Sequence, residues 1–286
     1  MKAASVPAPT YAFPQSRAAQ ITFVLLTVYV IYALTQLDVS LERVGQGLEH
    51  AGRFLGKMIP PNFARSELLW NGLAESLQIA VLASALGIVL ALPFGLLGAR
   101  NLMPSWVSWP ARLVIVVARS FHPVVVAILF VKAVGFGALA GILALTVASI
   151  GFIGKLFTEA IEEVSAKQVE AVRATGAPFT SMLAFGVLPQ VFSRFIGFAT
   201  YQLDSNLRNS TMVGIVGAGG IGGTLFAAFQ RFDYDFVSAI LISIIALIMA
   251  GEVLATAVRR IFIDNATLRQ LFRAGTPAHD RPLDDD

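Results

Sequence analysis

The sequence contains no cysteine and little charge. Without cysteine there can be no disulfide, thiolate metal ligand or thiol nucleophile. Charged residues make up 14% of the chain, whereas an average soluble domain carries about 25%. With 56% hydrophobic residues and a mean hydropathy of +0.72, the composition excludes a soluble globular domain and predicts an integral membrane protein.

Two further absences concern chemistry. The phosphate-binding motif G-x-x-x-x-G-K-[ST] does not occur, because Gly154-Lys155 lacks both the upstream glycine and the following hydroxyl. No pairing of a nucleophile with a base and no cluster of metal ligands can be identified, and His50 and His279 lie in polar segments. We therefore expect no catalytic site, no metal and no cofactor in this chain. Energy from ATP would have to come from another subunit.

Six hydrophobic stretches reach the length of about 20 residues that a membrane span requires. They lie at 18–37, 74–98, 113–133, 137–156, 191–213 and 236–258. The predicted fold class is therefore all-α, with about six transmembrane helices. We expect residues 1–70 to hold a disordered N-terminus, a first span that acts as a retained signal anchor, and an extracytoplasmic segment with a short helix before Pro60-Pro61. Residues 71–258 would form the transmembrane core and 259–286 a cytoplasmic tail.

Lysine and arginine predict the orientation, because short cytoplasmic loops carry their excess. With the N-terminus inside, the cytoplasmic set is the larger one: Lys2, Arg17, Arg100, Arg112, Lys155, Lys167, Arg173, Arg259, Arg260, Arg269, Arg273 and Arg281. The outside set is Arg43, Arg53, Lys57, Arg65, Lys132, Arg208 and Arg231. In this orientation both termini and the loop 157–190 lie in the cytoplasm. The membrane itself is predicted to be a bacterial cytoplasmic membrane. These basic residues are spread along loops rather than clustered with aromatics, so no nucleic-acid partner is predicted.

A short helix is predicted in that loop, over residues 166–175. Ser165 can cap its N-terminus and Gln168 can complete a capping box. Gly176 supplies a left-handed residue at the C-terminus, and Pro178 prevents the helix from continuing. The helix would be roughly 15 Å long. Its exposed side predicts docking into another protein.

The fifth span contains residues that a membrane helix rarely carries, among them Asp204, Asn206 and Arg208. Charges inside a span normally face a bundle interior or an aqueous cavity. Asp204 and Arg208 are four residues apart with the acid first, the favourable order for an ion pair on one helix face. Either the pair is structural, satisfying itself between helices, or the residues line a translocation pathway or its gate.

Six glycines follow within the ten residues from Gly214 to Gly223, including Gly217, Gly219, Gly220 and Gly222. Glycine disfavours a helix interior by about 1 kcal/mol against alanine, so a break or bend in the backbone is predicted here. Broken helices in transporters often border the substrate path; close packing against another backbone is the alternative. A dinucleotide-binding loop is rejected, because that fingerprint needs a preceding strand.

Five residues have the spacing of a motif known as the "EAA" loop: Glu170, Ala171, Gly176, Leu188 and Pro189. Through these residues the chain resembles the permeases of ABC importers, in which that loop occurs. The resemblance implies that the short helix, with Arg173, couples to an ATPase subunit. Two positions depart from the family pattern: Val172 replaces a second alanine, and Gly186 stands where isoleucine is usual.

A more specific resemblance is to the phosphonate-importer permeases. It rests on Tyr201 with Asp204-x-Asn206-x-Arg208, Ser210-Thr211, Val213-Gly214, Gly217-Ala-Gly-Gly-Ile-Gly222, Arg173-Ala-Thr-Gly-Ala177, Gly186-Val-Leu-Pro-Gln190, Leu77-Gln-Ile-Ala80 and Leu92-Pro-Phe-Gly-Leu96. It covers most of residues 70–258. Two departures bear on the substrate: Asp204 is commonly Glu in that family, and His122-Pro123 stands where a proline and an acid are frequent after Arg119.

The resemblance implies a type I ABC importer (MetI-like) permease fold, working as a homodimer. The implied partners are two ABC ATPase subunits that bind ATP and Mg, an extracytoplasmic substrate-binding protein, a small oxyanion substrate and the lipid bilayer. Arg119 and His122, with Arg208, could attract the anion, although Arg119 can also reach the cytoplasmic surface and His122 can be structural. A permease for phosphate, phosphite or an amino acid is the alternative; a membrane-embedded enzyme or an assembly scaffold is disfavoured.

Overall fold

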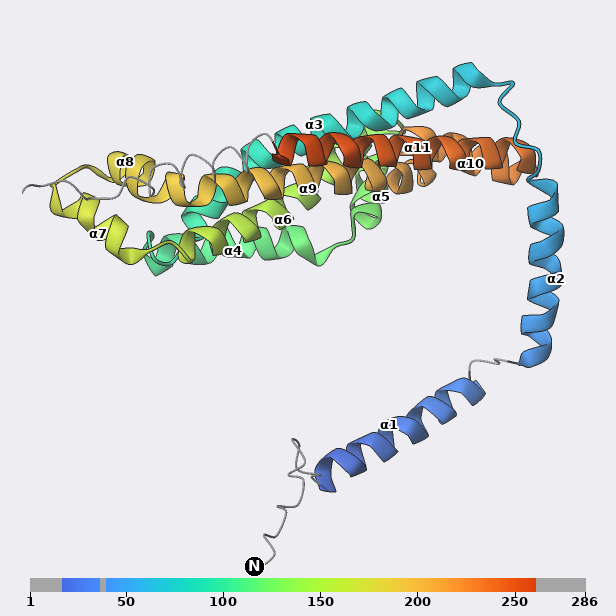
Figure 1. Ribbon diagram of the computed structural model, residues 1–286, viewed down its shortest axis with the longest axis horizontal. Coiled ribbons are helices and arrows are strands. Elements are labelled where there is room, and N and C mark those ends of the chain that lie inside the picture. The colour runs from blue at the N-terminus through green and yellow to red at the C-terminus, as the bar shows by residue number, and fades with distance from the viewer. Residues whose placement is uncertain (1–16, 37–39, 261–286) are drawn as a thin grey trace, which may run out of the picture. The chain divides into compact units, whose positions relative to one another are not determined.

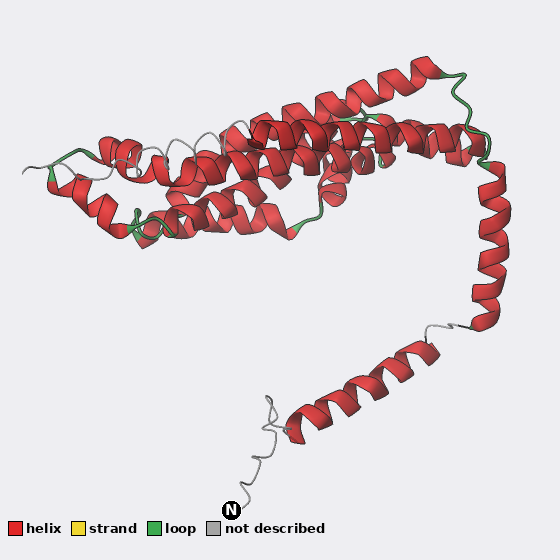
Figure 2. Ribbon diagram, viewed as in Figure 1, coloured by secondary structure: helices red, strands yellow, loops and turns green. Residues whose placement is uncertain are grey.

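The computed structural model describes residues 17–36 and 40–260, and every regular element in these ranges is helical (Figure 2). The chain divides into two units, residues 1–57 and 58–286. The first contains α1 (Arg17–Gln36) and α2 (Leu41–Lys57). The second contains α3 (Ser66–Gly98), α4 (Ser105–Ser120), α5 (Pro123–Val134), α6 (Ala138–Glu162), α7 (Ala166–Ala174), α8 (Phe179–Ser181), the π-helical segment η1 (Met182–Val187), α9 (Leu188–Ile215), α10 (Ile221–Gln230) and α11 (Tyr234–Arg259).

Five helical stretches in the described ranges are long and apolar enough to cross a membrane: α1, α3, α6, the stretch Phe179–Ile215 and α11. A sixth arises if α4 and α5 count as one span. The predicted all-helical class with about six spans is therefore confirmed. The short helix predicted before Pro60-Pro61 is also present, as α2.

The third span predicted over 113–133 is divided into α4 and α5 by a sharp bend. α4 and α5 meet at an angle of 92°, because Phe121 and His122 adopt extended backbone between them. Pro123 is the first residue of α5, where its missing N–H removes no helical hydrogen bond. Hydropathy runs on across this break and so could not reveal it.

α3 and α6 pack against each other more extensively than any other pair of described helices. Membrane helices approach closely where small residues face one another. At Gly87 an added Cβ would lie 2.2 Å from the Cβ of Ser149, so even alanine cannot fit there unless the helices separate. The α3–α6 pair is the frame against which α4, α5 and α9 pack.

The interior has three apolar clusters. One joins α3, α5, α6 and α9 around Ile79 and Leu145. A second joins α3, α10 and α11 around Ile240. The third joins α6, α7, η1 and α9 around Phe157 and Val187.

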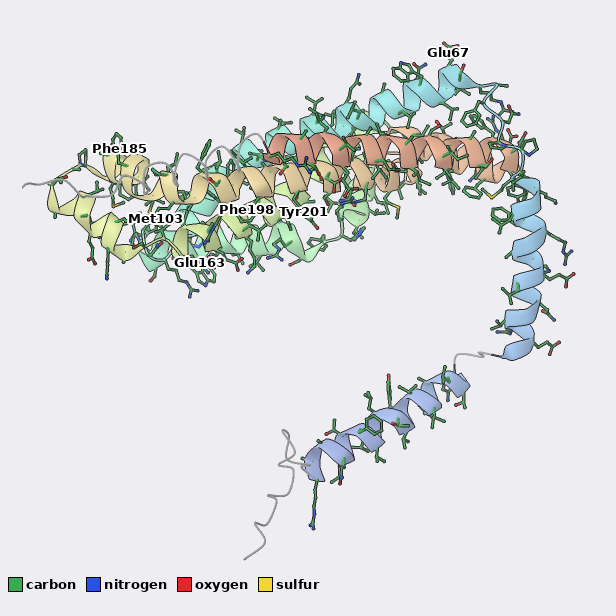
Figure 3. The ribbon with its side chains drawn as sticks, in the orientation of Figure 1. Glu67, Met103, Glu163, Phe185, Phe198 and Tyr201 are labelled. Carbon is green, nitrogen blue, oxygen red and sulfur yellow. The ribbon has the colours of Figure 1, made fainter. Side chains whose placement is uncertain are left out.

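The second unit has two distinct ends. α7 and α8 lie at one end, beyond the C-terminus of α6 (Figure 1). Glu67, in the first turn of α3, lies at the opposite end, whereas Phe185 and Glu163 lie at the α7 end (Figure 3). At the α3 end, Arg65 pairs with Asp233 at 2.5 Å and the Asn62 amide donates to the Asp235 carboxylate at 3.0 Å.

Candidate functional site

The short helix predicted over 166–175 is present as α7, Ala166–Ala174. Gly176 has a φ of +74°, as the predicted left-handed stop requires. The predicted capping box is wrong. The Ser165 side chain accepts no hydrogen bond from α7; instead its backbone N–H donates to Oε1 of Gln190, on α9, at 3.0 Å.

α7 is anchored to the core along one side. Val169 is buried and Val172 is half-buried in the apolar cluster that includes Met182 of η1. Arg173 donates from Nε to the Met182 sulfur at 3.3 Å. Gln190 receives the Ser165 N–H and donates in turn to the Gly186 carbonyl at 2.5 Å. α7, η1 and the start of α9 are therefore linked by direct contacts.

The other side of α7 is open. Lys167, Glu170, Ala171 and Ala174 are exposed. Phe185 of η1, at the same end of the unit, is 76% exposed (Figure 3). This surface combines an acid, a base and small residues on a rigid helix, which suits docking into a groove of another protein.

The remaining EAA positions lie at the base of this segment. Arg173 and Gly176 are exposed on and just after α7. Leu188 and Pro189 are exposed in the first turn of α9. Leu188 also lines an apolar pocket of about 390 Å³ together with Leu92 and Phe192.

The Asp204–Arg208 ion pair forms within α9, with Nη2 of Arg208 2.5 Å from Oδ2 of Asp204. The pair predicted on one helix face is therefore present; whether it is structural or lines a pathway stays open. The second oxygen of Asp204, Oδ1, is buried and has no hydrogen-bond partner among the described residues. The Arg208 side chain is 46% exposed, so its guanidinium can reach a ligand that comes alongside α9.

Asn206 is fully buried at the centre of a polar network that joins three helices. Its Nδ2 donates to the hydroxyls of Ser84 on α3 and Ser149 on α6, both at 2.9 Å. Gln202, also on α9, donates to Ser149 at 2.8 Å and to Oδ1 of Asn206 at 3.0 Å. The network ties α9 to the α3–α6 pair. A role for Asn206 on the pathway stays a prediction.

The glycine-rich stretch breaks the helix as predicted, between α9 and α10. Gly217, Gly219 and Gly220 have φ between +80° and +87°, a region that side chains with a Cβ disfavour. Close packing occurs as well, since a Cβ on Gly222 would lie 1.9 Å from the Thr211 carbonyl oxygen. The break and the close packing occur together, because a turn this tight presses α10 back onto α9; a place beside the substrate path stays a prediction.

The glycine turn is held from outside by two segments. The Ser76 hydroxyl of α3 accepts the first N–H of α10, from Ile221, at 2.9 Å. The turn that connects α5 to α6 donates the Gly137 N–H to the Gly217 carbonyl at 3.0 Å. The break is thus built into the core.

Arg119 and His122 lie at the bend between α4 and α5, and both are exposed. The stem of Arg119 packs over Gly151 of α6. Nδ1 of His122 accepts the Val124 N–H at 3.3 Å and so caps α5. Among the described residues no hydrogen bond or ion pair joins either side chain to Arg208.

A wide groove of about 740 Å³ runs between α6 and α9 and is lined in part by Phe152, Phe198 and Tyr201. The rings of Phe152 and Tyr201 stack with their centroids 5.5 Å apart, and Phe198 and Tyr201 follow one another along α9 (Figure 3). Tyr201 lies about one turn before Asp204, so the groove leads towards the ion pair.

Sequence reasoning missed several structural residues, chiefly Ser84, Ser149, Gln202 and Gln190. Isolated polar residues in apolar helices are the signal that could have drawn attention to the first three, but their common meeting point required the tertiary structure. In the described ranges no group of three or more His, Asp or Glu residues could hold a metal ion. The described residues therefore provide a short exposed helix, an exposed cation on α9 and a built-in break of the backbone.

Comparison with known proteins shows which family this chain belongs to. A family model described as "Binding-protein-dependent transport system inner membrane component" matches residues 91–265. That range includes α7, α9 and the glycine turn.

Two relatives agree with the family match. The phosphate-import permease protein PhnE of Mycolicibacterium smegmatis is 41% identical over 205 residues, which is 71% of this chain but 38% of that protein. The phosphite transport system permease protein PtxC of Stutzerimonas stutzeri is 38% identical over 217 residues, which is 76% of this chain and 79% of that protein.

Among solved structures, an inward-facing structure of the MetNI methionine ABC transporter matches with a TM-score of 0.60 at 24% identity. The match covers 69% of this chain and 99% of that chain. It shows that the folds are alike.

Proposed function

Because the chain belongs to the family of binding-protein-dependent transport system inner membrane components, we propose that it is the transmembrane permease of an ATP-driven importer for phosphonates or related small phosphorus oxyanions. The observation that carries the substrate class is the identity to a phosphate-import and a phosphite permease. Phosphonate, phosphite and phosphate share an anionic tetrahedral phosphorus group. A permease for phosphate or phosphite alone is the near alternative, and one for an amino acid the farther alternative.

The energy enters through α7. Two ABC ATPase subunits hold ATP and Mg, and each receives an α7 helix in a surface groove. Glu170 and Ala171 face the ATPase, while Val169 and Val172 hold the helix to the core. ATP-driven closure of the ATPases moves α7, and the contacts through Gln190 and Met182 pass the movement to η1 and α9.

α9 carries the substrate pathway in this proposal. The exposed Arg208 guanidinium provides a favourable potential for an oxyanion, and Asp204 orients it. The other residues that we assign to the pathway are Arg119, His122, Asn206 and the four glycines Gly217, Gly219, Gly220 and Gly222. The glycine turn lets the end of α9 and α10 shift together, so that the pathway opens alternately to the two sides.

The working assembly is a homodimer of this chain with two ATPases and an extracytoplasmic binding protein, in a bacterial cytoplasmic membrane. The α7 end faces the cytoplasm, and so do both termini. Basic residues gather around that end, where Arg112 pairs with Glu162 and Arg194 with Glu163, in keeping with the excess of Lys and Arg on cytoplasmic sides. Residues 71–258 form the permease core; the proposed tail lies outside the described residues beyond 260.

Reconstitution with the candidate ATPase and binding protein tests the proposal. ATP hydrolysis and uptake are measured with a phosphonate, phosphate and phosphite. We expect uptake and stimulated hydrolysis that Glu170→Arg abolishes without loss of folding, because the new cation cannot enter the groove that accepts the acid. The matched control is Glu49→Arg, the same charge change on the exposed α2.

Two results bear against separate parts of the proposal. An ATPase that never associates with the chain would refute the coupled importer altogether. Coupled hydrolysis with uptake of an amino acid, and none of the phosphorus oxyanions, would keep the importer and overturn its substrate.

A further inference from the structure

α2 is amphipathic to an unusual degree. At about 100° per residue, its seven polar residues fall within an arc of about 120°: Glu42, Arg43, Gln46, Glu49, His50, Arg53 and Lys57. The opposite side holds only apolar residues and glycine. Val44, Leu48 and Leu55 on that side are 52%, 70% and 57% exposed, so no other described part of the first unit covers them.

The four glycines of α2 show that the helix needs an external surface. Gly45, Gly47, Gly52 and Gly56 lie on the apolar side or at its edges, and a Cβ added at any of them would meet nothing within 4 Å. Glycine is the least favourable helix residue apart from proline. A helix of 17 residues with this content gains little from its own backbone, and most helix stability comes from burial of an apolar face.

The position of α2 along the chain indicates which surface that is. α1 has 20 residues and is about 30 Å long, the thickness of the bilayer hydrocarbon. Five Cα steps from Gln36 to Leu41 reach at most about 18 Å. α2 therefore begins close to the surface where α1 leaves the membrane, and the chain enters the membrane again at α3 after Pro60-Pro61.

We propose that α2 is an interfacial helix that lies in the plane of the membrane, with its apolar side among the lipid acyl chains and its polar side in water. A helix with a strong polar side, low net hydrophobicity and exposed leucines is the type that binds this way. The Arg53–Glu49 pair, at 3.2 Å, lies on the water side, with side chains 64% and 71% exposed. The inference does not depend on the substrate or on coupling to an ATPase.

The absence of cysteine makes a direct test possible. Single-cysteine variants of the full chain carry a nitroxide at position 48 or 55, on the apolar side, or at position 46 or 53, on the polar side. The protein is reconstituted in vesicles of phosphatidylethanolamine and phosphatidylglycerol. Accessibility of each label to oxygen, which partitions into lipid, is compared with accessibility to a water-soluble nickel complex.

We expect the labels at Leu48→Cys and Leu55→Cys to favour oxygen, and those at Gln46→Cys and Arg53→Cys to favour nickel. Adding Leu48→Asp to the Leu55→Cys variant should abolish its preference for oxygen, whereas adding Glu49→Gln should leave it unchanged. Equal access of nickel to all four positions would overturn the proposal, because α2 would then stand in water. Labels on the apolar side that neither reagent reaches would also overturn it, since a binding protein or a second copy would then cover the face.

Discussion

Replacing Asn206 by alanine tests whether the buried polar network holds α9 to the α3–α6 pair. The substitution removes two hydrogen bonds between helices, to Ser84 and Ser149, each worth about 0.6 kcal/mol in a membrane protein. The volume of the deleted carboxamide adds on the order of 1 kcal/mol, because the site is fully buried. We expect the free energy of unfolding to fall by about 2 kcal/mol in total.

The assay is titration of the full chain in mixed lipid and detergent micelles with SDS, followed by loss of helical circular dichroism. Asn209→Ala is the matched control. Its amide reaches only Ser205 on the same helix, at 3.4 Å, so its free energy of unfolding should change by no more than about 0.5 kcal/mol. Equal losses for the two variants would refute the reasoning.

A third variant, Asn206→Leu, separates packing from hydrogen bonding. Leucine fills most of the vacated volume but cannot bond Ser84 or Ser149, so we expect a loss close to the hydrogen-bond contribution of about 1 kcal/mol. Transport measured beside stability then bears on the pathway prediction. Uptake that falls in proportion to folded protein indicates a structural residue, whereas uptake lost at unchanged folding indicates contact with substrate.

Three further predictions concern the turn, the ion pair and the end of α7. Gly222→Ala should prevent assembly of the folded chain, since the new Cβ would lie 1.9 Å from a backbone oxygen. Gly223→Ala is the control, because the nearest atom to its Cβ is 3.6 Å away. Size-exclusion chromatography should show wild-type behaviour for the control and loss of the folded species for Gly222→Ala. Arg208→Asp should abolish uptake with normal assembly, and adding Asp204→Arg should not restore it; recovery in the double variant would favour a purely structural pair. Gly176→Ala should lower coupled ATP hydrolysis through roughly 1–2 kcal/mol of strain at positive φ, with basal hydrolysis of the free ATPase unchanged.

The elements predicted correctly are those set by local sequence. Length and hydropathy fixed the spans, because backbone groups in lipid must be satisfied within a helix. α7 was predicted to within one residue, since Gly176 ends a helix through its own φ. The break after Gly214 follows equally from the density of glycine.

The predictions that were wrong or incomplete depend on partners distant in the chain. In the predicted capping box Gln168 would accept the Ser165 N–H, but Gln190, 25 residues away, accepts it instead. The bend at Phe121 lies inside continuous hydropathy, so hydropathy alone does not give its angle of 92°. Asn206 was singled out as polar, but its hydroxyl partners come from two other helices.

The sequence by itself determined that this chain has membrane-spanning helices, that a short helix ends before Gly176, and that the backbone breaks in the glycine-rich stretch. Those features arise from the cost of exposing polar backbone to lipid and from the φ preferences of glycine and proline, which act within a few residues. Only the tertiary structure decided which polar side chains are buried together, that Arg208 remains exposed on α9, and how α7 is tied to η1 and α9. These depend on contacts between helices, and no single helix contains the information that sets them.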